Sequence, residues 1–130
     1  MTAFVVIMTV AIVVMIGLVL DGGSVLAARR EAIDEADGAA RAAAQSVAPA
    51  TRTSDRTVLD PARAQAAVDA YLAPTGHQGS VVVNGDSVAV TVSYSQHLEI
   101  LGAAGLGSVT VTGHGAARAV RGVNNETVGP

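Results

Sequence analysis

The sequence predicts an α+β fold in which an N-terminal transmembrane helix continues into an alanine-rich stalk helix, followed by a second short helix and a small antiparallel β-sheet. Three observations predict it. The first 20 residues carry no charge, the next stretch repeats alanine at helical spacing, and the chain beyond residue 80 alternates apolar and polar residues. With 130 residues, the chain has room for one small domain and an appendage.

Segment 1–21 is predicted to be a transmembrane helix. Twenty helical residues rise about 30 Å, which matches the hydrocarbon core of a bilayer. The run from Met1 to Leu20 has no polar stripe, whereas a core helix of a soluble protein keeps one polar side. The step Asp21-Gly22-Gly23 that follows is either a hinge where the helix leaves the bilayer or an ordinary helix boundary.

Two alternatives to this arrangement stay open. Val25-Leu26-Ala27 would suit a signal peptidase, although no basic stretch precedes the apolar run, and the run exceeds the roughly 7–15 residues usual in signal sequences. Arg29 and Arg30 follow the run, so the positive-inside rule taken literally keeps the rest of the chain in the cytoplasm. A basic leader ahead of Met1 would reverse that orientation.

Segment 22–48 is predicted to be an amphipathic stalk helix, with Asp21 or Ser24 as its N-cap and Pro49 as its end. Alanine recurs there at spacings of three and four, which gives the helix one smooth side. That side packs on the protein's own sheet or contacts helices of other subunits. Ala40, as an alternative to Ala39, and Val47 belong to the same face. We call its alanines the alanine seam, which consists of Ala28, Ala32, Ala36, Ala39 and Ala43.

The outer side of the stalk helix is charged. Arg30 with Asp34, and Asp37 with Arg41, are four residues apart and can form ion pairs. The acidic residues on this side are expected to form a solvated face rather than paired catalytic carboxylates. They are Glu31, Asp34, Glu35 and Asp37.

Segment 49–121 is predicted to be a small α+β domain. A polar loop over 51–57 leads to a helix that Asp60 caps and Pro61 begins, and that stops before Pro74. A short strand over 80–83 and its return strand then meet at a tight turn, for which Asn84-Gly85 supplies the positive φ.

The return strand alternates cleanly, which predicts one buried and one open face. An apolar loop or short helical turn over 96–106 interrupts the alternation. A third strand over 108–112 resumes it and can run on to Val120, and the tail 122–130 is expected to be flexible. The residues of the return strand expected on its buried face are Val88, Val90, Val92 and Tyr94.

The sequence predicts no enzyme and no cofactor. The chain has no Cys and no Lys, which excludes thiolate sites and gives no basic footprint for nucleic acid. His97 and Glu99 could share one face of a strand, but a surface pair is expected there rather than a metal or acid–base pair. His114, between two glycines, is expected in an irregular strand.

A family resemblance lies in the first third of the chain. The run Gly17-Leu18-Val19-Leu20-Asp21-Gly22-Gly23, the pair Arg29-Arg30 and the alanine-rich run 36–45 resemble the N-terminal module of TadE/TadG-like proteins of Tad (Flp-type) pilus systems, particularly actinobacterial versions. The later hairpin and the strand ending in Ala116-Ala117-Arg118 are similar to the family in a less distinctive way.

The resemblance implies a pilin-like or minor-pilin component of a Tad pilus or a related secretion apparatus. Such a protein is a single-pass membrane protein with an extracytoplasmic C-terminal domain, and its partners are membrane lipid and other pilin-like subunits or assembly proteins. Phe4 and Val5 stand where pilins often carry a glutamate, which favours a minor or membrane-retained component over a major subunit. The alternative is a membrane-tethered module that binds a ligand or protein without polymerising.

The alanine seam discriminates between these two functions. A seam covered within the monomer favours the binding module, and a seam left open for partners favours the pilin-like component. We expect ten residues to serve membrane-helix and subunit packing, namely Phe4, Val5, Gly17, Asp21, Gly22, Ala28, Ala32, Ala36, Ala39 and Ala43.

Overall fold

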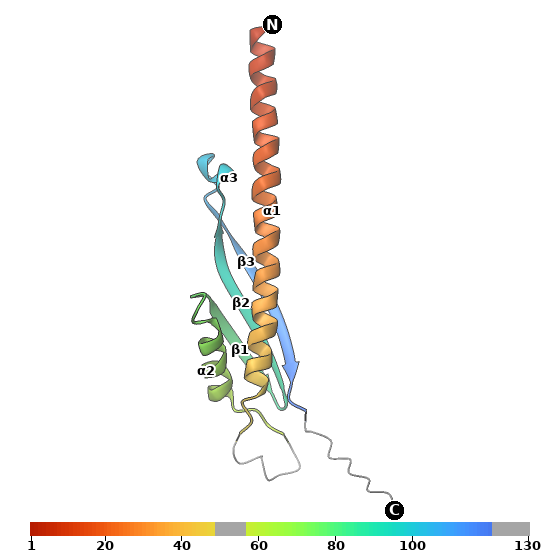
Figure 1. Cartoon of the computed structure of the whole chain (residues 1–130), viewed down its shortest axis with the longest axis vertical. Helices are drawn as coiled ribbons and strands as arrows, with labels where there is room; N and C mark the ends of the chain where they lie inside the picture. Colours follow the sequence, from red (N-terminus) through yellow and green to blue (C-terminus); the bar gives the residue numbers. More distant parts are fainter. Residues whose placement is uncertain (49–56, 121–130) are drawn as a thin grey trace, which may run out of the picture.

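One long helix organises the molecule. The computed structural model describes residues 1–48 and 57–120, and its first element is α1 (Thr2–Ala44), a helix without a break (Figure 1). At 1.5 Å per residue, its 43 residues extend about 65 Å. The apolar segment and the stalk are therefore one continuous rod.

The junction between the two halves of α1 differs from the prediction. Asp21-Gly22-Gly23 lies inside the helix, so neither Asp21 nor Ser24 is an N-cap, and the Ser24 hydroxyl donates to the Asp21 carbonyl at 2.8 Å. Contacts of α1 with α3 at Asp21 and with the sheet from Ala28 onward stabilise the helix across the two glycines, whose own helix propensity is low. At its other end the helix stops at Ala44, before the predicted Pro49.

The remaining elements form an α+β unit against the second half of α1. In chain order they are α2 (Pro61–Leu72), β1 (Gln78–Asn84), β2 (Ser87–His97), α3 (Ile100–Ala103) and β3 (Ser108–Arg118). The three strands form an antiparallel sheet in the order β1-β2-β3. The predicted α+β class and element order are confirmed.

The first hairpin has the predicted tight turn and the predicted positive φ at Gly85, but the turn is shifted by one residue. Asn84 pairs with Ser87, so Gly85 and Asp86 are the two loop residues. Gly85 has φ +65°, and no described residue other than glycine has a positive φ. A two-residue turn with glycine first matches the type II′ pattern, so Asn84 ends the strand instead of entering the turn.

The second hairpin is the longer one. β2 and β3 pair from Ser87 with Arg118 to His97 with Ser108, which confirms the extended third strand. His114 lies within this regular ladder, beside Thr91, so the expected irregular strand is wrong. Residues 98–107, here called the tip loop, join the strands and contain the short helix α3.

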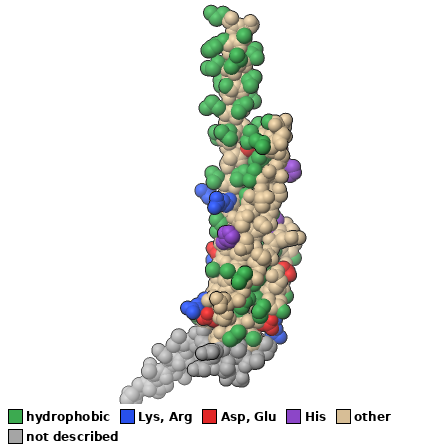
Figure 2. All heavy atoms as spheres, turned by 180° about the vertical axis from the view of Figure 1, so that it is seen from behind, with side chains coloured by type: hydrophobic (Ala, Val, Ile, Leu, Met, Phe, Trp, Pro, Cys, Tyr) green, Lys and Arg blue, Asp and Glu red, His purple; other side chains and the backbone are tan. Residues whose placement is uncertain are grey.

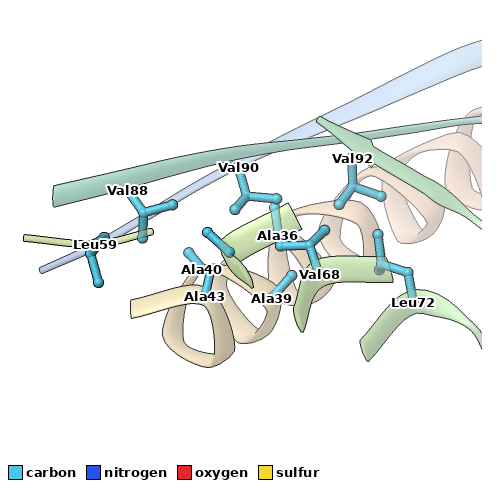
Figure 3. Packing of buried hydrophobic residues seen from close by; sticks show 11 residues of the cluster. Ala36, Ala39, Ala40, Ala43, Leu59, Val68, Leu72, Val88, Val90 and Val92 are labelled. Carbon is cyan, nitrogen blue, oxygen red and sulfur yellow. The ribbon is translucent and has the colours of Figure 1, made fainter. Parts of the chain in front are cut away.

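The core lies between α1, α2 and one face of the sheet. Val88, Val90 and Val92 of β2 point toward the alanine seam, while Val68 and Leu72 of α2 fill the side (Figure 3). These side chains are almost completely buried. Helix α2 starts as predicted, because the Asp60 carboxylate accepts the backbone N–H groups of Ala62 and Arg63.

Small residues on both sides bring α1 and β3 into direct backbone contact. Gly113 and Gly115 of β3 face the helix, and a Cβ atom on either would overlap the backbone of Ala32 or Ala36. Alanine on the helix and glycine on the strand therefore both allow the backbones of α1 and β3 to approach closely. The wide apolar side chains that usually separate a helix from a sheet are missing at this contact.

The predicted tail 122–130 and all but the last residue of the predicted loop 51–57 lie outside the described residues. The division of the chain into a membrane helix, a stalk and a domain remains a prediction, since the first two are parts of one helix.

Candidate functional site

The first half of α1 projects beyond the sheet, and almost nothing else in the described chain covers it (Figures 1 and 2). Its large apolar side chains are exposed all around the helix, from Phe4 and Val5 to Leu20. Within the described residues, this helix is the one long and apolar enough to cross a membrane. Its backbone groups bond within the helix, as a lipid environment requires.

Gly17 and Asp21 are buried at the lower end of this bare segment. Gly17 faces Ile100 of α3, and a Cβ at Gly17 would stand 2.6 Å from the Ile100 Cγ2 atom. The absence of a side chain on Gly17 therefore lets α3 lie close against α1.

Asp21 holds the tip loop by its carboxylate. Its two oxygens accept the backbone N–H groups of Glu99 at 3.2 Å, Ile100 at 3.1 Å and Leu101 at 2.6 Å. The residue is only 3% exposed. Asp21 thus satisfies the free N–H groups at the start of α3, a role that sequence reasoning missed.

A sequence signal for this contact exists. Gly17 and Asp21 lie four residues apart, and Ala28 follows Asp21 by two helical turns, so both continue the alanine seam toward the N-terminus. The sequence indicates that the two residues share the buried side of the helix. It does not indicate which distant segment of the chain meets them.

The alanine seam is covered by the protein's own sheet. Its five alanines are buried, and the valines labelled beside it in Figure 3 come from β2 and α2. This matches the first of the two interpretations above, packing within the chain. Gly22, in contrast, is exposed, and a methyl group added to it would have nothing within 4 Å.

A small polar cluster closes the edge of the contact between α1 and the sheet. His77 stacks on Tyr94 with ring centroids 3.8 Å apart, and its Nδ1 lies 2.8 Å from a carboxylate oxygen of Glu35. The Tyr94 hydroxyl donates to the Ala28 carbonyl at 2.7 Å and also approaches Glu31. The expectation of a wholly solvated acidic face is therefore wrong for Glu35, which is mostly covered.

Burial is the main cause that raises the pKa of the Tyr94 hydroxyl, and the negative charges of Glu31 and Glu35 raise it further. The phenol therefore stays protonated at neutral pH and remains a hydrogen-bond donor to α1. The cluster links β2 to α1. Its hydrogen bonds and ring stacking are contacts that hold the fold together, and they need no further role to explain them.

The predicted ion pairs of the stalk are absent from its described residues. The ion pairs found in the described parts of the chain are Arg63 with Asp60, His77 with Glu35 and Arg118 with Asp86. In residues 1–48 and 57–120, no group of three or more His, Cys, Asp or Glu side chains is placed to hold a metal ion.

Comparison with known families matches residues 1–46 to the family described as "Putative Flp pilus-assembly TadE/G-like". The match covers the bare segment and the alanine seam, and so includes all ten predicted packing residues. No curated protein and no solved structure gives a significant match. The narrower likeness to actinobacterial versions stays a prediction. Residues 1–46 are thus similar to the TadE/G-like segment of Flp pilus assembly, which confirms the resemblance seen in the sequence.

Proposed function

We propose that this protein is a membrane-anchored, pilin-like component of a Tad-type pilus or a related secretion apparatus, with a structural role and no catalytic one. The observation that carries the proposal is the bare first half of α1. Its exposed Val, Ile, Leu and Met side chains would face water on every side if the protein were free in solution. A bilayer, or neighbouring helices in an assembly, would cover them.

The family match supports the choice of apparatus. The matched residues end at 46, where α1 has just finished, so the similarity concerns the anchor and the stalk. We infer that the anchor places the α+β domain outside the cytoplasm and that lipid and other pilin-like subunits are its partners. Phe4 and Val5, which bring no carboxylate to this region, favour a minor subunit that starts or supports an assembly.

The anchoring itself is tested by charge substitution. Val10→Arg with Val13→Arg puts two guanidinium groups on the bare segment, at about 2.5–3.5 kcal/mol each for membrane insertion. Val82→Arg with Val120→Arg is the matched control, since both positions are exposed and lie outside the bare segment. We expect the first variant to leave the membrane fraction and the control to stay. Equal membrane retention would contradict the proposal.

The orientation is tested with an external protease on intact cells. A C-terminal tag is followed while the N-terminal mass of the membrane-bound remainder is read in parallel. Loss of the tag with the apolar segment retained supports an extracytoplasmic domain. A protected tag, in cells where a known surface protein is cut, would mean that the positive-inside rule read from Arg29 and Arg30 gives the true orientation.

The second candidate is a membrane-tethered binding module that does not polymerise. The covered alanine seam favours it, because that surface is occupied within the chain and is not free for another subunit. Single-cysteine variants separate the two functions, since the chain has no cysteine of its own. A Phe4→Cys protein that cross-links to pilus subunits, with Val82→Cys as the unlinked control, supports the pilin-like component. No cross-link at Phe4 favours the module.

A further inference from the structure

The tip loop lies at the end of the sheet that points toward the bare segment of α1 (Figure 1). Ile100 sits against Gly17, and the Asp21 carboxylate holds the backbone of residues 99–101. Gly17 precedes Asp21 by one helical turn, about 6 Å, and so lies inside the apolar run. The loop is therefore fixed level with the last turn of the segment proposed to cross the bilayer.

The tip loop is unusually apolar for an exposed connection. Glu99 is the one ionisable residue of the tip loop, and no residue from Ile100 to Gly113 has an ionisable side chain. Leu106 is 62% exposed, and Ile100 and Val109 are also exposed. Surface loops in contact with water are normally polar, and clustered exposed apolar side chains mark a contact surface.

The opposite end of the sheet has the reverse character. There the turn at Gly85 and Asp86 meets the end of β3, and the Arg118 Nε donates to the Asp86 carboxylate at 2.7 Å. The space-filling view shows apolar side chains along the bare helix, whereas the arginine side chains lie beside the domain, from about mid-height to its lower end (Figure 2). The sheet thus ends in an ion pair on one side, and in a loop with a single ionisable residue, Glu99, on the side nearest the anchor.

We propose that the tip loop is a second membrane contact, and that it dips into the boundary between headgroups and acyl chains of the bilayer that α1 crosses. This inference rests on the proposed anchoring. Interfacial elements bury their apolar side chains about 5–10 Å into this boundary, which matches the level of Ile100 beside Gly17. The single-pass protein then contacts its membrane at two points. The second contact restricts the tilt of the α+β domain relative to the bilayer.

Asp21 makes such a contact possible at a depth where water is scarce. Backbone N–H groups at the start of α3 would be costly near lipid without a partner, and so would a lone carboxylate. Each satisfies the other, because three N–H groups converge on the two Asp21 oxygens. Leu106 and Ile100 can then face lipid while the polar groups at the start of α3 keep their partners.

Single tryptophans test the inference, since the chain has none. The full chain is reconstituted in phosphatidylcholine–phosphatidylglycerol vesicles in three variants, Leu106→Trp in the tip loop, Val82→Trp on β1 and Val10→Trp in the bare segment. Emission maximum, quenching by acyl-brominated lipid and quenching by aqueous iodide are measured for each. Val82 is 67% exposed and carries the same substitution, so it controls for the interfacial preference of tryptophan itself.

We expect Leu106→Trp to emit at shorter wavelength than Val82→Trp, to be quenched by brominated lipid and to be protected from iodide. Iodide quenching equal to that of Val82→Trp overturns the inference. So does a blue-shifted Leu106→Trp that brominated lipid does not quench, because protein, such as a second copy, then covers the loop. Val10→Trp separates the two proposals: if lipid quenches it but not Leu106→Trp, only the tip contact fails, and if lipid quenches neither, the anchor fails as well.

Discussion

Residues 2–20 and 21–44 of α1 belong to one helix, yet their surroundings are opposite. The first stretch has large apolar side chains around its whole circumference, and within the described chain almost nothing covers them. The second has alanine on one side and charge on the other, and the sheet covers the alanines so closely that backbones touch. Side-chain size thus separates two kinds of apolar surface, one suited to fluid lipid and one suited to a fixed protein partner.

The largest effect is expected where the two backbones meet. Gly115→Ala places a methyl group into the backbone of Ala36, which cannot move aside as a side chain would. We expect a loss of at least about 3 kcal/mol in the free energy of unfolding, or no docked sheet at all. Near-ultraviolet circular dichroism of Tyr71 and Tyr94 during urea titration measures it.

Gly22→Ala is the matched control on the helix, because nothing lies within 4 Å of its added methyl group. It should stabilise the helix by up to about 1 kcal/mol. If Gly115→Ala unfolds at the same urea concentration as this control, the close contact between α1 and β3 is not present in solution.

The same truncation in the two halves of the molecule compares their surroundings directly. Val90→Ala removes two buried methyl groups from a residue that is 1% exposed, which should cost on the order of 2 kcal/mol. Val10→Ala removes the same atoms from a residue that is 56% exposed, and should change the domain's unfolding by less than about 0.5 kcal/mol. Equal losses would mean that the bare segment packs on the domain.

Asp21 lies where the two halves join, and its removal should act locally. Asp21→Ala leaves the N–H groups of Glu99, Ile100 and Leu101 without their acceptor, at a cost of about 1–3 kcal/mol. Amide hydrogen exchange in micelles should accelerate at Ile100 and Leu101. Asp21→Asn keeps one acceptor oxygen, so its exchange rates should lie between those of the wild type and Asp21→Ala. Unchanged exchange in Asp21→Ala would show that α3 needs no cap.

The smallest effect is expected at the charged end of the sheet. The Arg118 guanidinium, through its hydrogen bond, lowers the pKa of the Asp86 carboxyl below its ordinary value of 3.8. The carboxylate therefore contributes its full stabilisation above pH 3.8 and loses it as the pH falls through the lower pKa of the folded state. Unfolding measured against pH should show this loss in the wild type and a smaller loss in Arg118→Gln, where the Ser87 hydrogen bond to Asp86 remains. Arg29→Gln, an exposed arginine on α1, should keep the wild-type slope, and identical slopes in all three would exclude the contribution.

Local patterns in the sequence predict most of the elements. Asp60 and Pro61 mark the start of α2, and the alternation from Val88 to Tyr94 marks the strand that faces the helix. The apolar run, the alanine seam and the family resemblance are also readable from the sequence, and the match over residues 1–46 confirms the last of these.

The misses have a common physical origin. Asp21 looks like a helix cap and Glu35 looks solvated because their partners, α3 and His77, lie far along the chain and leave no trace in local spacing. The unbroken helix through Gly22-Gly23 is missed for a related reason. The contacts of α1 with the sheet and with α3 stabilise the helix, and local sequence spacing does not show them. Long-range contacts set the structure and burial of these residues, and local patterns in a single sequence do not show such contacts.

The close contact of α1 with β3 has a consequence for how the chain is made. The helix is synthesised first, and β3, whose glycines meet its backbone, is synthesised last, with α2, β1, β2 and α3 between them. Until residue 118 has emerged, the part of the seam that faces β3 lacks its partner, and contacts so distant in sequence form slowly. A row of alanine methyl groups presents less apolar surface to another chain than a row of leucine side chains would. The alanines that permit the final tight contact thereby also expose less apolar area to other chains while the protein is unfinished.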